Sequence, residues 1–397
     1  MIISILGRQP AIGVAELERV NGSNAVSWFS DISATVDVGS FDIQRYGSIV
    51  KSGRVVAEIP RGDWRNVSMK LVKAYQEAWH DRSGKITLGI SAYGFDGISS
   101  RDVQKTGLVL KQKLRKNDVS LRLVPNADLA LSSATSHHNK LGLADNKVEL
   151  LVVRAKNGKV IIAESLGTQN ITALAARDQG RPKRDAFVGM LPPKLALTMI
   201  NLSGVTKILN DSPNNPTPTI LDPFCGTGVV LQEAALLGFS VYGSDLSEKM
   251  VRYSRDNINW LADSQRIRFD WYLHEGDAMT ADWRTPIDAV VAETYLGQPF
   301  SAPPSDIKLK EVRGNCNHII SNFLKNIGQQ INPGTPLCLA VPAWRDAVGR
   351  ITRLPIIDKL DEYGYEQIAL KNVSNKDLIY YREDQVVARE LLILVKK

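Results

Sequence analysis

Residues 219–228 read Thr-Ile-Leu-Asp-Pro-Phe-Cys-Gly-Thr-Gly, and this stretch decides the fold. An apolar run ends in an acid, a proline and a Gly-x-Gly turn, and a helical pattern follows over residues 228–237. Glycine has no Cβ, so it lets the backbone approach a ligand closely and adopt positive φ. The pattern predicts the strand, loop and helix of a nucleotide-type cofactor site, with a plain tight turn as the alternative.

Strands and helices alternate through the rest of this region. Such alternation predicts a mostly parallel sheet with right-handed crossovers, and two final strands without a helix between them predict an antiparallel pair at one edge. The expected strands are 219–221, 241–243, 267–273, 287–292, 337–341, 367–372 and 386–395, and the expected helices are 228–237, 247–261, 318–330 and 351–363. Ser247 is expected to cap the second of these helices.

Acidic residues follow four of the strands in this sheet: Asp222, Asp245, Asp277 and Glu293. Ligands of such sheets bind beyond the carboxyl ends of the strands. Asp245 is placed to accept hydrogen bonds from ribose hydroxyls, and Asp277 from an adenine amine. The alternative is that each acid is a helix cap or a surface charge. The dinucleotide fingerprint needs a third glycine where this chain has Leu231, so that fingerprint is incomplete.

The positive charge of the chain is concentrated in its middle. The 397 residues carry a formal net charge of +7, yet residues 51–167 alone hold 20 Lys or Arg and 11 Asp or Glu. This excess favours a polyanionic partner, with a lysine-rich solvated surface as the alternative. The three cysteines lack metal-type spacing, the N-terminus lacks a signal peptide, and no apolar run reaches the ~20 residues of a spanning helix. We therefore expect a soluble cytoplasmic protein, with no membrane and no metal.

Four segments are expected. Residues 1–62 contain strands at 2–6, 34–38 and 54–59 and a helix at 12–20, which predicts a small α+β domain. Residues 63–167 contain helices at 63–79 and 105–117, strands at 85–93 and 121–124, and a hairpin across Asn157-Gly158. Lys111, Lys113 and Lys116 lie on the second helix and are candidate phosphate contacts. Residues 168–190 form a linker, and 191–397 form the sheet domain, which begins with a helix that Pro192-Pro193 starts.

The middle segment resembles a THUMP domain. The resemblance rests on Gly-Ile-Ser-Ala-Tyr-Gly at 89–94, Leu-Lys-Gln-Lys-Leu-Arg-Lys at 110–116 and Ser-Ser-Ala-Thr-Ser-His-His-Asn at 132–139. It implies binding to the end of tRNA. His137 and His138 are alternative zinc ligands, but adjacent side chains of a strand would point to opposite faces. Phosphate contact or a plain loop is the preferred interpretation.

The glycine loop, with Gly-Ser-Asp at 243–245 and Gly-Asp-Ala at 276–278, resembles that of Rossmann-fold methyltransferases. Together with residues 6–10, 181–194 and 381–385, it resembles the THUMP-containing tRNA guanosine-N2 methyltransferases that act at position 10. This resemblance implies a ferredoxin-like N-terminal domain, S-adenosylmethionine as methyl donor and tRNA as partner. The implied cofactor-binding residues are Pro193, Asp222, Phe224, Gly226, Gly228, Asp245, Leu246, Asp277, Ala278 and Glu293.

The chain departs from that family at the end of its fourth expected strand. Family members carry Asp-Pro-Pro-Tyr there, whereas residues 293–296 read Glu-Thr-Tyr-Leu. The resemblance implies that Glu293 and Tyr295 are catalytic, with Glu293 orienting the amine or accepting its proton. Tyr295 or Phe300 would stack on the base. Small displacements of reacting groups can cost ~100-fold in rate. The different sequence at residues 293–296, which we call the catalytic corner, therefore alters the part of the site where methyl transfer would occur.

Three functions therefore stay open. The first is an S-adenosylmethionine-dependent tRNA methyltransferase that modifies the exocyclic N2 of a guanosine. The second is a tRNA-binding protein whose methyltransferase domain is inactive, and the third is a methyltransferase acting on another RNA or on DNA. The need for a small activating subunit also stays open.

Overall fold

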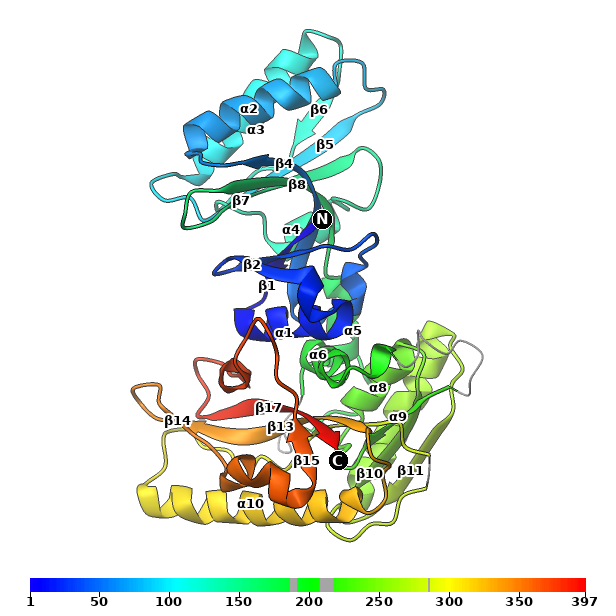
Figure 1. The fold of residues 1–397 in the computed structure, drawn as a ribbon. Coiled ribbons are helices and arrows are strands. Elements are labelled where there is room, and N and C mark those ends of the chain that lie inside the picture. Colours follow the sequence, from blue (N-terminus) through cyan, green and yellow to red (C-terminus); the bar gives the residue numbers. More distant parts are fainter. Residues whose placement is uncertain (186–190, 208–216, 285) are drawn as a thin grey trace. The chain divides into compact units, whose positions relative to one another are not determined.

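The computed structural model describes residues 1–185, 191–207, 217–284 and 286–397 (Figure 1). The chain forms two compact units: Met1–Leu17 with Asn24–Ala173, and Glu18–Ser23 with Leu174–Lys397. Within the described ranges, no helix is both long enough and apolar enough to cross a membrane.

The first unit is built on one mixed eight-stranded sheet in the order β2-β3-β1-β4-β8-β7-β5-β6. Its strands are β1 (Ile2–Leu6), β2 (Val26–Ser30), β3 (Ser33–Val36), β4 (Ile49–Ile59), β5 (Ile86–Tyr93), β6 (Leu121–Leu123), β7 (Lys147–Arg154) and β8 (Val160–Thr168). Its helices are α1 (Pro10–Asn21, which ends in the second unit), α2 (Trp64–Ala78), α3 (Ser100–Arg115) and α4 (Ser133–His138), with 3-10 turns η1 (Ser23–Ala25) and η2 (Ile43–Arg45). The expected hairpin across Asn157-Gly158 joins β7 to β8, and Gly158 has φ of +87°.

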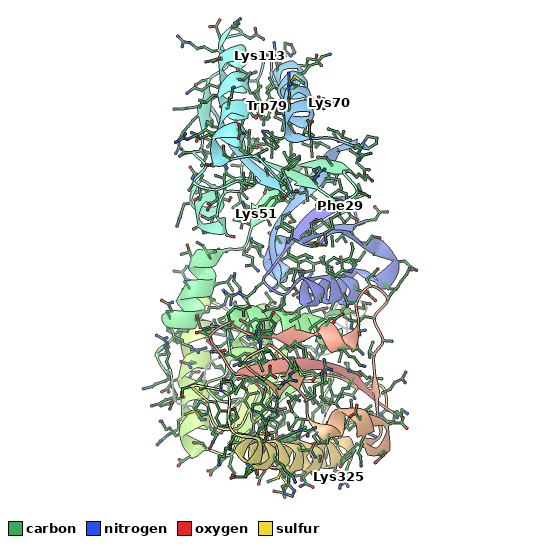
Figure 2. The ribbon with its side chains drawn as sticks, turned by 90° about the vertical axis from the view of Figure 1, so that its left-hand side faces the viewer. Phe29, Lys51, Lys70, Trp79, Lys113 and Lys325 are labelled. Atoms are coloured by element: carbon green, nitrogen blue, oxygen red, sulfur yellow. The ribbon has the colours of Figure 1, made fainter. Side chains whose placement is uncertain are left out.

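Helices α2 and α3 are amphipathic, and their apolar side chains share one core with the sheet. Figure 2 labels Lys70 on α2 and Lys113 on α3. The sequence placed the start of the second helix at residue 105. In the structure α3 begins at Ser100, because Ser99 and Asp102 form a capping box. Residues 133–138 form a helix, so the strand geometry considered for the two histidines is wrong.

The interior of this sheet contains an ion pair. Lys51, labelled in Figure 2, lies on β4 and is 1% exposed. Its Nζ donates to the Glu149 carboxylate on β7 and to the Leu131 carbonyl at 2.7 Å. Ser91 Oγ on β5 also donates to Glu149 Oε1, at 2.6 Å. These bonds satisfy a charge that would otherwise be unpaired in an apolar interior, and they link three strands.

The second unit is a doubly wound α/β structure whose sheet runs β11-β10-β9-β12-β13-β17-β15, with β14 and β16 attached to β13 and β17. Its strands are β9 (Thr219–Asp222), β10 (Ser240–Asp245), β11 (Trp271–Glu275), β12 (Ala289–Glu293), β13 (Pro336–Arg345), β14 (Ile351–Thr352), β15 (Tyr365–Gln367), β16 (Ile379–Tyr380) and β17 (Val387–Lys396). Its helices within the described ranges are α5 (Ile171–Gln179, which begins in the first unit), α6 (Pro193–Ser203), α8 (Val229–Leu236), α9 (Glu248–Gln265) and α10 (Asp306–Gly328), with 3-10 helices η3 (Pro355–Tyr363) and η4 (Asn375–Asp377).

The order of these strands confirms the expected fold class. The pairs β11-β10, β10-β9, β9-β12 and β12-β13 are parallel, whereas β17 is antiparallel to both β13 and β15. In the second unit, α6 and α8 lie on one face of the sheet and α10 on the other (Figure 1). The sheet therefore brings the carboxyl ends of β9, β10, β11 and β12 to one edge.

Several element boundaries differ from expectation. Helix α10 begins at Asp306, twelve residues before the expected start, because Ser305 caps it by accepting from Lys308 N. Residues 351–363 form β14 and the 3-10 helix η3 rather than one α-helix. Ser247 occupies the N-cap of α9, but its side chain makes no capping hydrogen bond. The expected linker contains α5, and its residues 186–190 lie outside the described ranges.

Candidate functional site

The glycine loop joins β9 to α8 through a tightly bonded turn. Gly228 N donates to Cys225 O at 2.7 Å, and Cys225 N donates to Ser244 O on β10 at 2.9 Å. Gly228 is the N-cap of α8 with φ of +80°, and a Cβ there would lie 2.9 Å from Ser254 Oγ. Gly226 also has positive φ, but a Cβ on it would meet nothing closer than 3.9 Å. The loop therefore packs tightly at Gly228 and leaves space at Gly226.

Asp245, the last residue of β10, connects this loop to the neighbouring strand end. Its Oδ2 accepts from Gly226 N at 2.9 Å, and its Oδ1 accepts from Ser247 N at 2.9 Å. Burial raises the pKa of Asp245, although both backbone hydrogen bonds oppose this shift. Each carboxylate oxygen can accept a second hydrogen bond, so the group can still receive a hydroxyl.

Asp222, the last residue of β9, is 2% exposed. Its Oδ1 accepts from Phe224 N at 3.1 Å. Burial raises the pKa of Asp222 well above its usual range; the Phe224 hydrogen bond opposes this, and the charges of Asp245 and Glu293 add to it. The structure thus places these three predicted acids at the ends of three adjacent strands, β9, β10 and β12.

Glu293 ends β12, level with Ala340 of β13. Its carboxylate accepts a hydrogen bond from Nε of Arg389 on β17. Sequence reasoning missed Arg389, although an arginine inside the apolar run 387–396 is an available signal. Next to Glu293, Thr294 is buried, and both its N and its Oγ1 donate to Ala340 O, at 3.0 and 3.2 Å.

The residues after β11 form a turn beside Asp245. Gly276 N donates to Asp245 O at 3.0 Å, and Asp277 Oδ1 accepts from Met279 N at 2.9 Å. Ala278 is buried in the core, so it offers a ligand little side-chain surface. Leu246, in contrast, is 71% exposed, which is high for an apolar side chain beside a candidate site.

The aromatic candidates differ in exposure. Tyr295 is 41% exposed, as stacking on a base would need. Phe224 and Phe300 are partly buried against the core, and the Phe224 ring contacts Phe323 edge-on with centroids 5.1 Å apart. Tyr295 is therefore the more accessible of the two predicted stacking residues, Tyr295 and Phe300.

The segment 181–185 is attached to the glycine loop through Asn257 of α9. Asn257 Oδ1 accepts from Lys183 N at 2.9 Å, and its Nδ2 donates to Lys183 O at 3.0 Å and to Thr227 O at 2.8 Å. Arg181 is buried with no hydrogen-bond partner at its three guanidinium nitrogens. Pro193 begins α6 and is buried, and Gly189 and Met190 of the same predicted stretch lie outside the described ranges.

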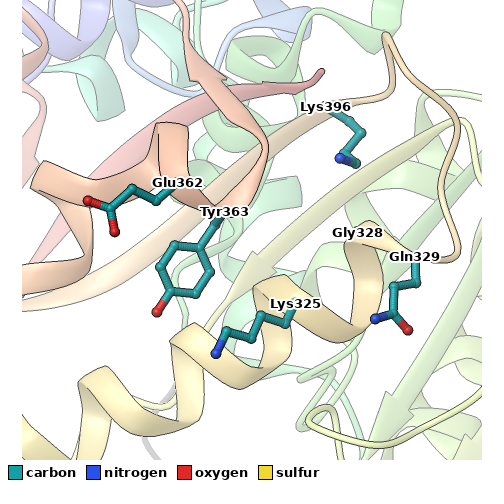
Figure 3. Close-up of a pocket in the computed structure, with 6 residues that line it drawn as sticks. All are labelled: Lys325, Gly328, Gln329, Glu362, Tyr363 and Lys396. Carbon is teal, nitrogen blue, oxygen red and sulfur yellow. The ribbon is translucent and has the colours of Figure 1, made fainter.

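A pocket of about 480 Å³ lies elsewhere in this unit, near the C-terminal end of α10 (Figure 3). It is lined by Lys325, Gly328, Gln329, Glu362, Tyr363 and Lys396. None of the predicted site residues lines it. Among the described residues, no group of three or more His, Cys, Asp or Glu side chains is arranged to hold a metal ion.

The predicted phosphate contacts belong to the first unit. Lys111 and Lys113 are exposed on α3, and Lys116 is its exposed C-cap residue. Lys113 Nζ donates to Gln76 Oε1 of α2 at 3.0 Å. The three lysines lie on a solvent-facing helix surface, where a polyanion can reach them.

Comparison with known proteins gives a consistent result. Residues 181–309 match the family model described as "UPF0020: RMKL-like, methyltransferase domain". The chain is 30% identical over 171 residues to the tRNA (guanine(10)-N2)-dimethyltransferase of Methanothermobacter thermautotrophicus, covering 43% of this chain and 44% of that protein. It is 33% identical over 116 residues to the enzyme of the same name from Pyrococcus abyssi, covering 29% of this chain and 27% of that protein. The matched part is thus less than half the length of either relative.

The fold likeness extends further than the sequence likeness. The crystal structure of TrmN from Thermus thermophilus superposes with a TM-score of 0.53 at 15% identity, covering 100% of this chain and 99% of that one. At this identity the likeness shows the fold alone. The second unit of the chain therefore carries a domain similar to the UPF0020 methyltransferase domain, on a Rossmann-like sheet.

Proposed function

We propose that the chain is an S-adenosylmethionine-dependent methyltransferase that modifies the exocyclic N2 of a guanosine in tRNA. One observation carries the proposal: Asp222, Asp245 and Glu293 end the adjacent strands β9, β10 and β12, beside a glycine loop whose Gly226 amide is bonded to Asp245. The name shared by the two archaeal relatives supports the substrate.

The residues at this edge fit the cofactor. The open space at Gly226 gives a ligand access to the loop backbone, and Asp245 offers free lone pairs for ribose hydroxyls. Leu246 presents an uncovered apolar side chain for a flat ring, with Asp277 nearby as an acceptor for an amine. Phe224, Gly228, Ala278 and Pro193 would shape the walls of this site.

S-adenosylmethionine supplies an electrophilic methyl group on a sulfonium sulfur. The protein's task is then to present the guanine amine, whose nitrogen is a weak nucleophile, in the right orientation. Glu293 would accept a hydrogen bond from this amine, direct its lone pair and take the proton that the nitrogen loses. Tyr295, or Phe300 after a rotation of its side chain, stacks on the base and holds its plane.

The tRNA would be held in part by the basic surface of residues 63–167, which includes Lys111, Lys113 and Lys116. Such contacts release counterions from the phosphates and supply affinity without reading sequence. We also propose that this segment is a THUMP-like domain and that the protein is located in the cytoplasm.

The test is a methylation assay with the purified full chain, labelled S-adenosylmethionine and total tRNA, followed by nucleoside mass spectrometry. N2-methylated guanosine in the product is the expected result. A folded protein that binds the cofactor and yields no methylated guanosine would contradict the proposal. Activity that appears only after a cell extract is added would indicate a small activating subunit.

A tRNA-binding protein with an inactive methyltransferase domain is the second candidate. It is favoured by the Glu-Thr-Tyr-Leu sequence at 293–296. It predicts that cells carrying Glu293→Ala keep every tRNA modification, whereas the first proposal predicts the loss of one. Competition of labelled tRNA by ribosomal RNA fragments and by duplex DNA tests the third candidate, a methyltransferase with another nucleic-acid substrate.

A further inference from the structure

Arg389 and Glu293 form an ion pair at the catalytic corner. Glu293 lies level with Ala340 on β13, and Arg389 lies level with Pro342 on the same strand, so the arginine side chain reaches across β13. The side chains are 11% exposed for Arg389 and 17% for Glu293, and the donor is Nε of the guanidinium to Oε1 of the carboxylate. The pair is thus mostly shielded from water, so dissolved salt screens it only weakly.

The neighbouring residue on β17 provides an internal comparison. Adjacent residues of a strand point to opposite faces, so Glu390 lies on the other face of the sheet from Arg389. Glu390 is also paired, with Arg353 Nε at 3.1 Å. One strand therefore carries two ion pairs, and only the Arg389 pair includes a predicted site residue.

The backbone beside Glu293 is held by hydrogen bonds. Thr294 N and Oγ1 both donate to Ala340 O, which continues the ladder between β12 and β13 past the end of the strand. Proline at position 294 could not make the first of these bonds, because it has no N–H. The backbone of the corner is fixed, but the longer glutamate side chain has one more rotatable bond than aspartate and needs its own restraint.

We infer that Arg389 is a positioning residue for Glu293, an inference that rests on the proposed function. Its hydrogen bond holds Oε1 and leaves Oε2 to accept from the amine of the guanine. Arg389 thereby restrains the carboxylate of Glu293, and the Thr294 hydrogen bonds restrain the backbone beside it. Arg389 acts through Glu293 and does not touch the base.

The experiment compares Arg389→Met and Arg389→Lys with the matched control Arg353→Met, in the full chain. We expect Arg389→Met to lower kcat for N2-methylguanosine formation by about 100-fold, the loss typical of a misplaced reacting group, with KM for tRNA and cofactor affinity within about threefold. Arg389→Lys should recover part of the rate because it keeps the charge. Arg353→Met breaks the pair on the opposite face and should leave kcat unchanged.

A double-mutant cycle with Glu293→Gln separates positioning from a general structural role. If Arg389 works through Glu293, adding Arg389→Met to Glu293→Gln lowers kcat by a further factor of less than about three, because the two changes remove one interaction. Independent, multiplying losses would overturn the inference, as would equal losses of kcat in Arg389→Met and Arg353→Met. Thermal melting checks folding, and Arg389→Lys and Arg389→Gln replace Arg389→Met in the cycle if that variant is unfolded.

The wild-type protein distinguishes failure of this inference from failure of the proposed function. A folded wild type that binds S-adenosylmethionine and methylates no guanosine refutes both. An active wild type whose Arg389 variants keep its kcat refutes the positioning role alone.

Discussion

The backbone amide of Gly226 donates to Oδ2 of Asp245 at 2.9 Å, so a hydrogen bond joins the glycine loop to the end of β10. Ser247 N holds the other oxygen of the same carboxylate at 2.9 Å. A site whose walls are held in place binds its ligand with a smaller loss of conformational entropy.

Asp245→Ala removes both acceptors and the carboxylate proposed to bind ribose. We expect its affinity for S-adenosylmethionine, measured by calorimetry, to fall at least about tenfold, the effect of about 1.4 kcal/mol. Glu275→Ala is the matched control, because Glu275 ends β11 level with Asp245 and is exposed. A similar loss in both variants would argue against a specific role for Asp245.

The buried carboxyl of Asp222 makes stability depend on pH. Because its pKa is raised in the folded state, its contribution is fully present below the unfolded pKa of about 3.9 and is lost as pH rises through the folded pKa. The ligand-free protein should therefore melt at a lower temperature at pH 8 than at pH 5. Asp222→Asn should flatten this dependence and raise stability at pH 8. Asp277→Asn is the control. If the difference in melting temperature between pH 5 and pH 8 is the same in Asp222→Asn as in the unchanged protein, the burial argument is contradicted.

Gly228 and Gly238 lie near the two ends of α8, both with positive φ, but only Gly228 lacks room for a Cβ. Alanine at either position should lower the free energy of unfolding by about 1–2 kcal/mol, because its Cβ disfavours the left-handed backbone conformation. Gly228→Ala should cost more, because its Cβ would lie 2.9 Å from Ser254 Oγ, and it alone should abolish cofactor binding. Urea unfolding and calorimetry of the two variants check this, and equal behaviour would count against a special role for the loop.

The basic helix α3 can be tested by salt dependence. Reversing Lys111, Lys113 and Lys116 to glutamate should reduce the slope of log K for tRNA binding against log salt by about 2, since each lost phosphate contact removes about 0.7–0.9. Reversing Lys310, Lys325 and Lys359 together is the control for net charge, because these three lysines are also exposed and lie outside α3. If the slope changes as much in the control, the affinity does not depend on α3.

The sequence predicted the second unit well where local signals are strong. The glycine loop, the acids after β9, β10 and β12, and the antiparallel final strands follow from apolar runs, glycines and their order. The start of α10 was missed although Leu309, Val312 and Cys316 already recur at helical spacing before residue 318, with Ser305 available as a cap. The 3-10 helix over residues 355–363 has the amphipathic pattern of an α-helix, and only its backbone distinguishes the two.

Contacts between distant residues were beyond sequence reasoning. Arg389 is 96 residues from Glu293, and their pairing depends on β17 lying beside β13. The attachment of Lys183 to Asn257 spans 74 residues in the same way. A single sequence indicates which groups are charged or apolar, but the strand order decides which of them meet. The division at residue 62 and the roles of the site residues stay predictions.

Strand β4 has a consequence for how the protein can be shortened. It pairs with β1 on one side and with β8 on the other, so residues 1–62 supply the strand beside β8. Proteolysis or gene truncation at residue 62 would leave β8 with a row of unpaired amides and carbonyls, which is a template for aggregation. We therefore expect residues 63–167 to fold and to be expressed in soluble form only together with residues 1–62.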